Sequence, residues 1–188
     1  MAGEAPAAGR PLETVSAPRE GHGAANGELG SGPAAVPSSP APATEPAVPA
    51  PPAGQTSRPW SEMDDGARRA WIHRTLARLA TSAFRARFTL SAKDRAYALD
   101  RGEAVIRQHA RDLLEKRVGP AEPARDGKQT PFRGHPVFTA QHACACCCRG
   151  CIEKWHRIPR GRALADDELD RLTALVIAWI RRDIARHR

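Results

Sequence analysis

Large apolar side chains are missing from the first third of this 188-residue chain, which contains no Phe, Trp, Tyr or Ile before Trp60. The same segment holds 12 of the 17 prolines and 8 of the 15 glycines. Such a composition cannot bury enough apolar surface to offset the entropy lost on folding. The sequence therefore predicts a disordered Ala/Pro/Gly-rich arm over residues 1–60 and one folded domain over residues 61–188.

Two further absences bear on location. No run reaches the ~18 apolar residues that a membrane-spanning helix needs, and the N-terminus lacks the basic and apolar regions of a signal peptide. We therefore expect no membrane association and a cytoplasmic protein. In a reducing compartment, clustered cysteines favour metal or redox chemistry over a disulfide framework.

Acidic residues are absent between Gly66 and Lys93, a stretch that contains six arginines. Residues 61–188 carry 26 Arg and Lys against 16 Asp and Glu. A basic surface of this kind can bind nucleic acid or another polyanion, and the first predicted helix is the best candidate for the contact face. Net charge alone specifies no ligand, so a role in solubility is the simpler interpretation.

No alternating run is long enough to predict a strand, so the predicted fold class is a small all-α domain of five to six helices with a long Pro/Gly loop. Ser61 with Asp64, and Ser91 with Asp94, resemble capping boxes at helix starts. Gly119 and Pro120 form a typical helix end. The predicted helices cover approximately residues 61–88, 91–102, 103–118, 136–145 and 166–185.

The segment 119–135 is predicted to be a loop, because its prolines prevent regular structure. Loops of more than ~12–15 residues in a small domain are usually functional or disordered. We expect this one to line a pocket or to cover the cysteine segment. The candidate pocket residues are His109, Lys128, Arg133 and His135. His109 lies on the apolar face of its helix, so a buried histidine with ordinary hydrogen bonds is the simpler interpretation there.

All five cysteines fall within the stretch HACACCCRGCIEKWH, residues 142–156. One unbroken helix would place Cys144 and Cys151 about 10 Å apart along its axis, too far to share an ion. Gly150 permits a positive φ, so the segment Cys148-Arg-Gly-Cys151 can turn as a metal knuckle does. His156 follows at the spacing of a zinc knuckle, whereas the fourth position of that motif falls on Gly161, which cannot ligate.

The remaining ligand must therefore come from elsewhere, and the candidates are Cys147, His142, His135 and Cys144. Mixed Cys and His donors favour zinc over an iron–sulfur cluster, whose usual cysteine spacing is absent. Four protein ligands would make the ion structural, whereas three with a water could support hydrolysis, with Glu153 as the nearest base. Redox-active thiols and free buried cysteines are the alternatives.

The strings DGKQTPFRGHPVFTAQHA and CCRGCIEKWHRIPRG, with weaker matches elsewhere between Arg87 and Ile184, resemble a bacterial family, domain of unknown function 4186. The resemblance implies no reaction. In the family pattern threonines stand at positions 144 and 146, whereas the other Cys and His residues of the segment match. The resemblance therefore implies Cys148, Cys151 and His156 as ligands, with Cys147 or His142 completing the set.

Three functions are compatible with these patterns. The first is an uncharacterised zinc-stabilised helical domain, whose metal is structural or serves in binding a polyanion. The second is a metal-dependent enzyme of unknown reaction, with the loop 119–135 as a pocket wall. The third is an interaction domain with free buried cysteines. The sequence does not decide whether the protein is an enzyme.

Overall fold

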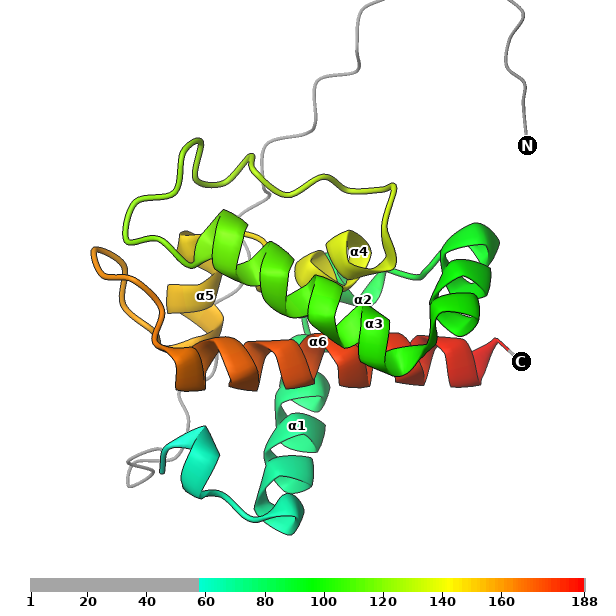
Figure 1. Cartoon of the computed structure of the whole chain (residues 1–188), viewed down its shortest axis with the longest axis horizontal. Coiled ribbons are helices and arrows are strands. Elements are labelled where there is room, and N and C mark those ends of the chain that lie inside the picture. The colour runs from blue at the N-terminus through cyan, green and yellow to red at the C-terminus, as the bar shows by residue number, and fades with distance from the viewer. Residues whose placement is uncertain (1–57, 188) are drawn as a thin grey trace, which may run out of the picture. The chain divides into compact units, whose positions relative to one another are not determined.

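The computed structural model describes residues 58–187, which form a succession of helices without a strand, as predicted. Residues 1–57, which make up most of the predicted disordered arm, lie outside the described residues. Figure 1 shows the short 3-10 helix η1 followed by helices α1 to α6. Their bounds are η1 Trp60–Glu62, α1 Asp65–Leu79, α2 Ala83–Ala86, α3 Ala92–Val118, α4 Pro136–Ala143, α5 Arg149–His156 and α6 Asp166–Arg186.

Helix α6 is the element around which the others pack. It contacts α3, α4, α1 and η1, and Figure 1 shows α3 on one side of it and α1 on the other. Its buried apolar face is made by Leu169, Leu172, Leu175, Val176, Ile177 and Ile180. Each such side chain contributes about 1.5–3 kcal/mol when it is fully buried.

The predicted first helix is divided in two. Asp64 caps α1, because its side chain accepts a hydrogen bond from the Ala67 amide at 2.8 Å. The expectation that Ser61 begins this helix is therefore wrong, since Ser61 lies in η1. The expectation of one helix up to residue 88 is also wrong, because α1 ends at Leu79 and Ser82 caps the separate helix α2.

Most of the other predicted boundaries are confirmed, but the helix expected over residues 136–145 ends at Ala143. Ser91 caps α3 by accepting from the Asp94 amide, and Gly119 ends it. Gly102 breaks α3 internally with φ 77° and ψ 160°, a conformation that is open almost only to glycine. The predicted change of helix at residue 102 is therefore present as a sharp bend.

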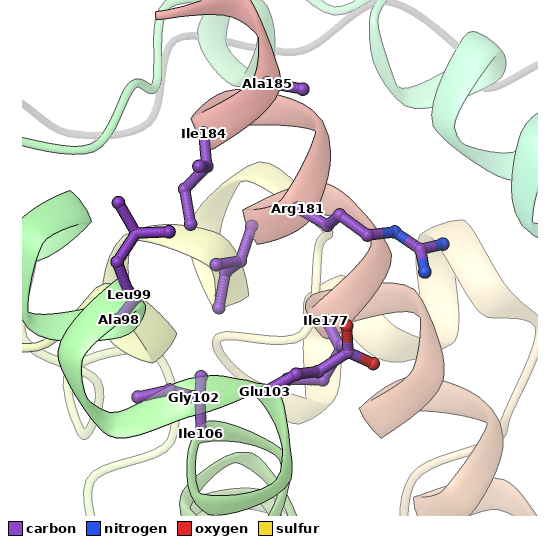
Figure 2. A pocket seen from close by; sticks show the side chains of 10 residues that line it. Ala98, Leu99, Gly102, Glu103, Ile106, Ile177, Arg181, Ile184 and Ala185 are labelled. Atoms are coloured by element: carbon purple, nitrogen blue, oxygen red, sulfur yellow. The ribbon is translucent and has the colours of Figure 1, made fainter. Parts of the chain in front are cut away.

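The bend in α3 opens an apolar cleft of about 400 Å³ against α6. Figure 2 shows Leu99 of α3 and Ile184 of α6 pointing toward one another across it, whereas Arg181 points away from it. Leu99 is 53% exposed. None of the predicted site residues lines this cleft.

The loop between α3 and α4 lies over the cysteine segment, as expected. The Thr130 hydroxyl donates to the Cys147 carbonyl at 2.9 Å, and the Asp126 carboxylate accepts from the Arg149 amide at the start of α5. Hydrogen bonds therefore fix this loop over the cysteine segment. None of the helices within residues 58–187 is both long and apolar enough to cross a bilayer.

Candidate metal centre

The turn between α4 and α5 brings cysteines together. Helix α4 ends at Ala143, and Ala145 then adopts a positive φ of 56°. The Cys146 amide donates back to the Gln141 carbonyl at 2.7 Å. The chain reverses here, so Val137 to His156 is not one helix and the axial separation that would prevent a shared ion does not arise.

Gly150 does not make this turn. The expectation of a positive φ at Gly150 is wrong, because it lies inside α5 and only Gly102, Gly127, Gly134 and Gly161 are the positive-φ glycines of the described chain. Cys148 is instead the N-cap of α5, and its sulfur accepts from the Cys151 amide at 3.4 Å. An N-cap side chain reaches back over the first turn, so ordinary helical geometry brings both sulfurs together.

Three cysteine sulfurs form a cluster. The Sγ atoms of Cys147, Cys148 and Cys151 all lie within 4.8 Å of one another, and those of Cys147 and Cys151 are 3.6 Å apart. A tetrahedral zinc ion with bonds of ~2.3 Å separates its sulfur ligands by about 3.8 Å. The cysteine cluster can therefore hold a metal ion.

The cluster also favours a negative charge. The thiols of Cys147 and Cys148 donate hydrogen bonds to Cys151 and, with the nearby Arg85 guanidinium, hold the pKa of Cys151 far below its usual value. Although the neighbouring Cys147 lowers the pKa of Cys148, the hydrogen bond to Cys151 together with burial raises that pKa to about 11. One thiolate is thus stabilised by two neighbouring thiols, and a divalent cation could replace their protons.

Arg85 is the residue of this site that sequence reasoning missed. It is only 3% exposed, and its guanidinium contacts the Cys151 sulfur at 3.5 Å, the His142 carbonyl at 2.7 Å and the Trp155 ring. In the sequence it is one of six arginines in an acid-free stretch, and no local signal distinguishes it from the others.

The two histidines that were predicted as ligands lie outside the sulfur cluster. The His156 Nε2 atom donates to the Cys144 carbonyl at 2.8 Å, and burial, with positive charge from Arg171, lowers its pKa to about 3. The His142 Nε2 atom donates to the Thr130 carbonyl at 3.2 Å. Burial lowers the pKa of His142, and the charge of Cys151 partly opposes this.

Cys144 and Cys146 belong to the hydrophobic core. Both have no exposed surface, and burial raises the pKa of each thiol. The Cys144 sulfur lies against the Leu175 carbonyl of α6, and the Cys146 sulfur lies 3.7 Å from His156. Neither thiol is part of the sulfur cluster.

The four predicted pocket residues do not converge on one place. His135 accepts from the Val137 amide through Nδ1 and therefore donates from Nε2 to His109 at 3.2 Å. Burial and the neighbouring His109 lower the pKa of His135. Arg133 lines a separate cleft, and Lys128 is exposed on the loop. Glu153, the candidate base, is paired with Arg160 at 3.0 Å.

Comparison with known proteins agrees with the resemblance. The family model described as Domain of unknown function (DUF4186) matches residues 73–181, a range that includes Arg85, the loop and the whole cysteine segment. No solved structure matches the chain significantly. The match covers more than half of the chain, and the protein belongs to this family of unknown function.

Proposed function

We propose that the protein is a zinc-binding helical domain whose ion is held by Cys147, Cys148 and Cys151. The observation that carries the proposal is the clustering of the three sulfurs within 4.8 Å. Thiolate ligands at this spacing suit zinc better than magnesium or calcium, which prefer oxygen. When bound, the ion would act as a cross-link between residues of the α4–α5 turn.

A structural role is supported by what surrounds the cluster. Arg85 joins it to α2, and Thr130 joins the Cys147 carbonyl to the loop. The ion would therefore fix a region where three segments meet. The alternative of an enzyme is less well supported, because Glu153 is paired with Arg160 and the His109–His135 pair is not part of the cluster.

His142 is the best candidate for the fourth ligand. Its Nε2–H group donates a hydrogen bond to the Thr130 carbonyl. In the neutral ring, Nδ1 then carries no proton and is the nitrogen that could bind a metal ion. Burial lowers the pKa of this ring, and a negative charge on Cys151 acts in the opposite direction, to raise it. Among the described residues, no fourth Cys, His, Asp or Glu donor belongs to the same cluster, so a shift of this side chain or a water would complete the coordination.

The test is elemental analysis of full-length protein purified without a metal-affinity tag. We expect about one zinc per chain, lost in Cys148→Ser and retained in Cys144→Ser, whose thiol is buried outside the cluster. Cobalt substitution should give thiolate-to-metal charge-transfer absorption in the same two-variant pattern. Metal-free protein that also fails to take up added zinc would overturn the proposal, as would equal metal loss in both variants.

A further inference from the structure

A second, basic cleft lies beside the metal centre. It has a volume of about 640 Å³ and runs between the α2–α3 segment and the end of the long loop. The basic residues that line it are Arg87, Lys93 and Arg133, and the aromatic residues that line it are Phe88 and Phe132. We call this the basic cleft. Its volume is within the ~300–1,000 Å³ that small-molecule sites usually occupy.

The three cations of the basic cleft are not neutralised by the protein. Arg87, Lys93 and Arg133 are all exposed, and within residues 58–187 none of them is in a salt bridge. Asp94 is the one acidic residue among those that line the cleft, and it accepts a hydrogen bond from Ser91. Three cations face one carboxylate, so the cleft attracts anions.

Other arginines of the domain are used differently. Arg111 is paired with Asp166 at 2.7 Å and with Asp170, and Arg162 is paired with Glu168. On the predicted basic face, Arg68 and Arg78 bind backbone carbonyls. The basic cleft therefore gathers cations that no carboxylate of the described residues pairs with, although the Arg87 guanidinium also lies over the Phe84 ring at 4.4 Å. Arginine is well suited to such a site because its planar guanidinium binds phosphate through two donors.

An aromatic ring stands beside these cations. Phe132 is 46% exposed, although it is a large apolar side chain. It is fixed by stacking on His142, with ring centroids 4.1 Å apart and an angle of 9° between the planes. Phe88 lies parallel to it at 6.3 Å. Rigid exposed aromatic rings next to basic side chains are the typical platform for stacking of nucleic-acid bases.

We propose that the basic cleft binds a nucleoside phosphate, with its base stacked on Phe132 and its phosphate bound by Arg133, Arg87 and Lys93. Two sources share this chemistry: a free mononucleotide, or one nucleotide of a single-stranded nucleic acid. None of these lining residues is a ligand of the metal centre, although Phe132 stacks on His142, the proposed fourth ligand. The polyanion contact then lies at the cleft rather than on α1.

The test is fluorescence anisotropy of a short labelled oligothymidylate with full-length protein at low salt. Arg133→Glu should weaken binding about tenfold or more, and Phe132→Ala should do so by a similar factor because the base loses the ring on which it stacks. The matched control is Arg74→Glu, the same charge change at an exposed position of α1 that does not line the cleft. It should leave the affinity within about twofold, since binding depends on local phosphate contacts.

Competition with thymidine monophosphate and with inorganic phosphate distinguishes the sources. Displacement by the mononucleotide but not by phosphate assigns a nucleotide site, whereas displacement by neither assigns a single-strand site. Phe132→Leu replaces the ring while keeping an apolar side chain on His142, and thermal melts verify that each variant is folded. Absence of oligonucleotide and mononucleotide binding at low salt would overturn the inference. So would an equal effect of Arg74→Glu, or wild-type affinity in the folded Phe132→Leu variant.

Discussion

The guanidinium of Arg85 lies 3.5 Å from the sulfur of Cys151, although the two residues are 66 positions apart in the chain. The contact joins α2 to the first turn of α5. It places a buried positive charge next to three thiols that would together carry up to three negative charges as metal ligands. A neighbouring cation reduces the cost of that charge, so Arg85 is suited to support the metal centre without ligating.

Arg85→Met should therefore lower zinc affinity by about ten- to a hundredfold, the usual effect of removing a supporting contact of a metal site. Arg85→Lys should recover part of the loss, because it keeps the charge. Affinity would be measured by competition with a chromophoric chelator. The matched control is Arg87→Met, two residues away and exposed, which should bind zinc as the wild type does. Equal affinities of Arg85→Met and the wild type would contradict the assigned role.

The two histidines that flank the cysteine segment should differ in their effect on the ion. His142→Ala should change the absorption of the cobalt-substituted protein in the visible region, because a nitrogen ligand would be replaced by water. His156→Gln should leave the spectrum unchanged, since His156 contacts Cys146 and the Cys144 carbonyl rather than the sulfur cluster. The reverse pattern would restore His156 as the ligand that the zinc-knuckle spacing indicated.

Local signals in the sequence were enough to predict most helix boundaries. Ser91, Gly119 and Pro136 act at the positions where their backbone chemistry predicted them to act. The approach of the Cys148 and Cys151 sulfurs was also predicted, but Gly150 is not the residue that brings them together. The sequence favours Gly150 as the turn because glycine permits a positive φ, whereas the fold needs only the N-cap geometry of Cys148. Arg85 was not predictable, because its position depends on how α2 packs against α4, which no local pattern encodes.

The two glycines should respond in opposite ways to alanine. Gly150 is helical and a methyl group there would meet no atom within 4 Å, so Gly150→Ala should leave zinc binding intact and raise the free energy of unfolding by about 0.5–1 kcal/mol. Gly102 also has free space, but its φ of 77° is strained for alanine. Gly102→Ala should lower the free energy of unfolding by about 1–3 kcal/mol. Urea denaturation measures both, and loss of zinc in Gly150→Ala would restore the knuckle turn.

His156 should make stability depend on pH. Its pKa is lowered from 6.5 to about 3 by burial, and the charges of Arg171, Arg78 and Arg85 add to this. Between these values the unfolded chain binds a proton that the native state does not. The free energy of unfolding should therefore fall as pH decreases from about 6 toward 3, by about 1.4 kcal/mol per pH unit from this one group.

The contribution of His156 can be separated from those of other groups by comparing slopes. His135 and His142 also have lowered pKa values, so they steepen the same acid limb. His156→Gln removes one titrating proton while keeping a side chain that can donate to the Cys144 carbonyl. In urea denaturation across this pH range, the variant should show a slope that is smaller by about 1.4 kcal/mol per pH unit, whatever its overall stability. Parallel profiles for variant and wild type would show that His156 is protonated in the native protein, which is incompatible with its burial and with an Nδ1 atom that has no hydrogen-bond partner.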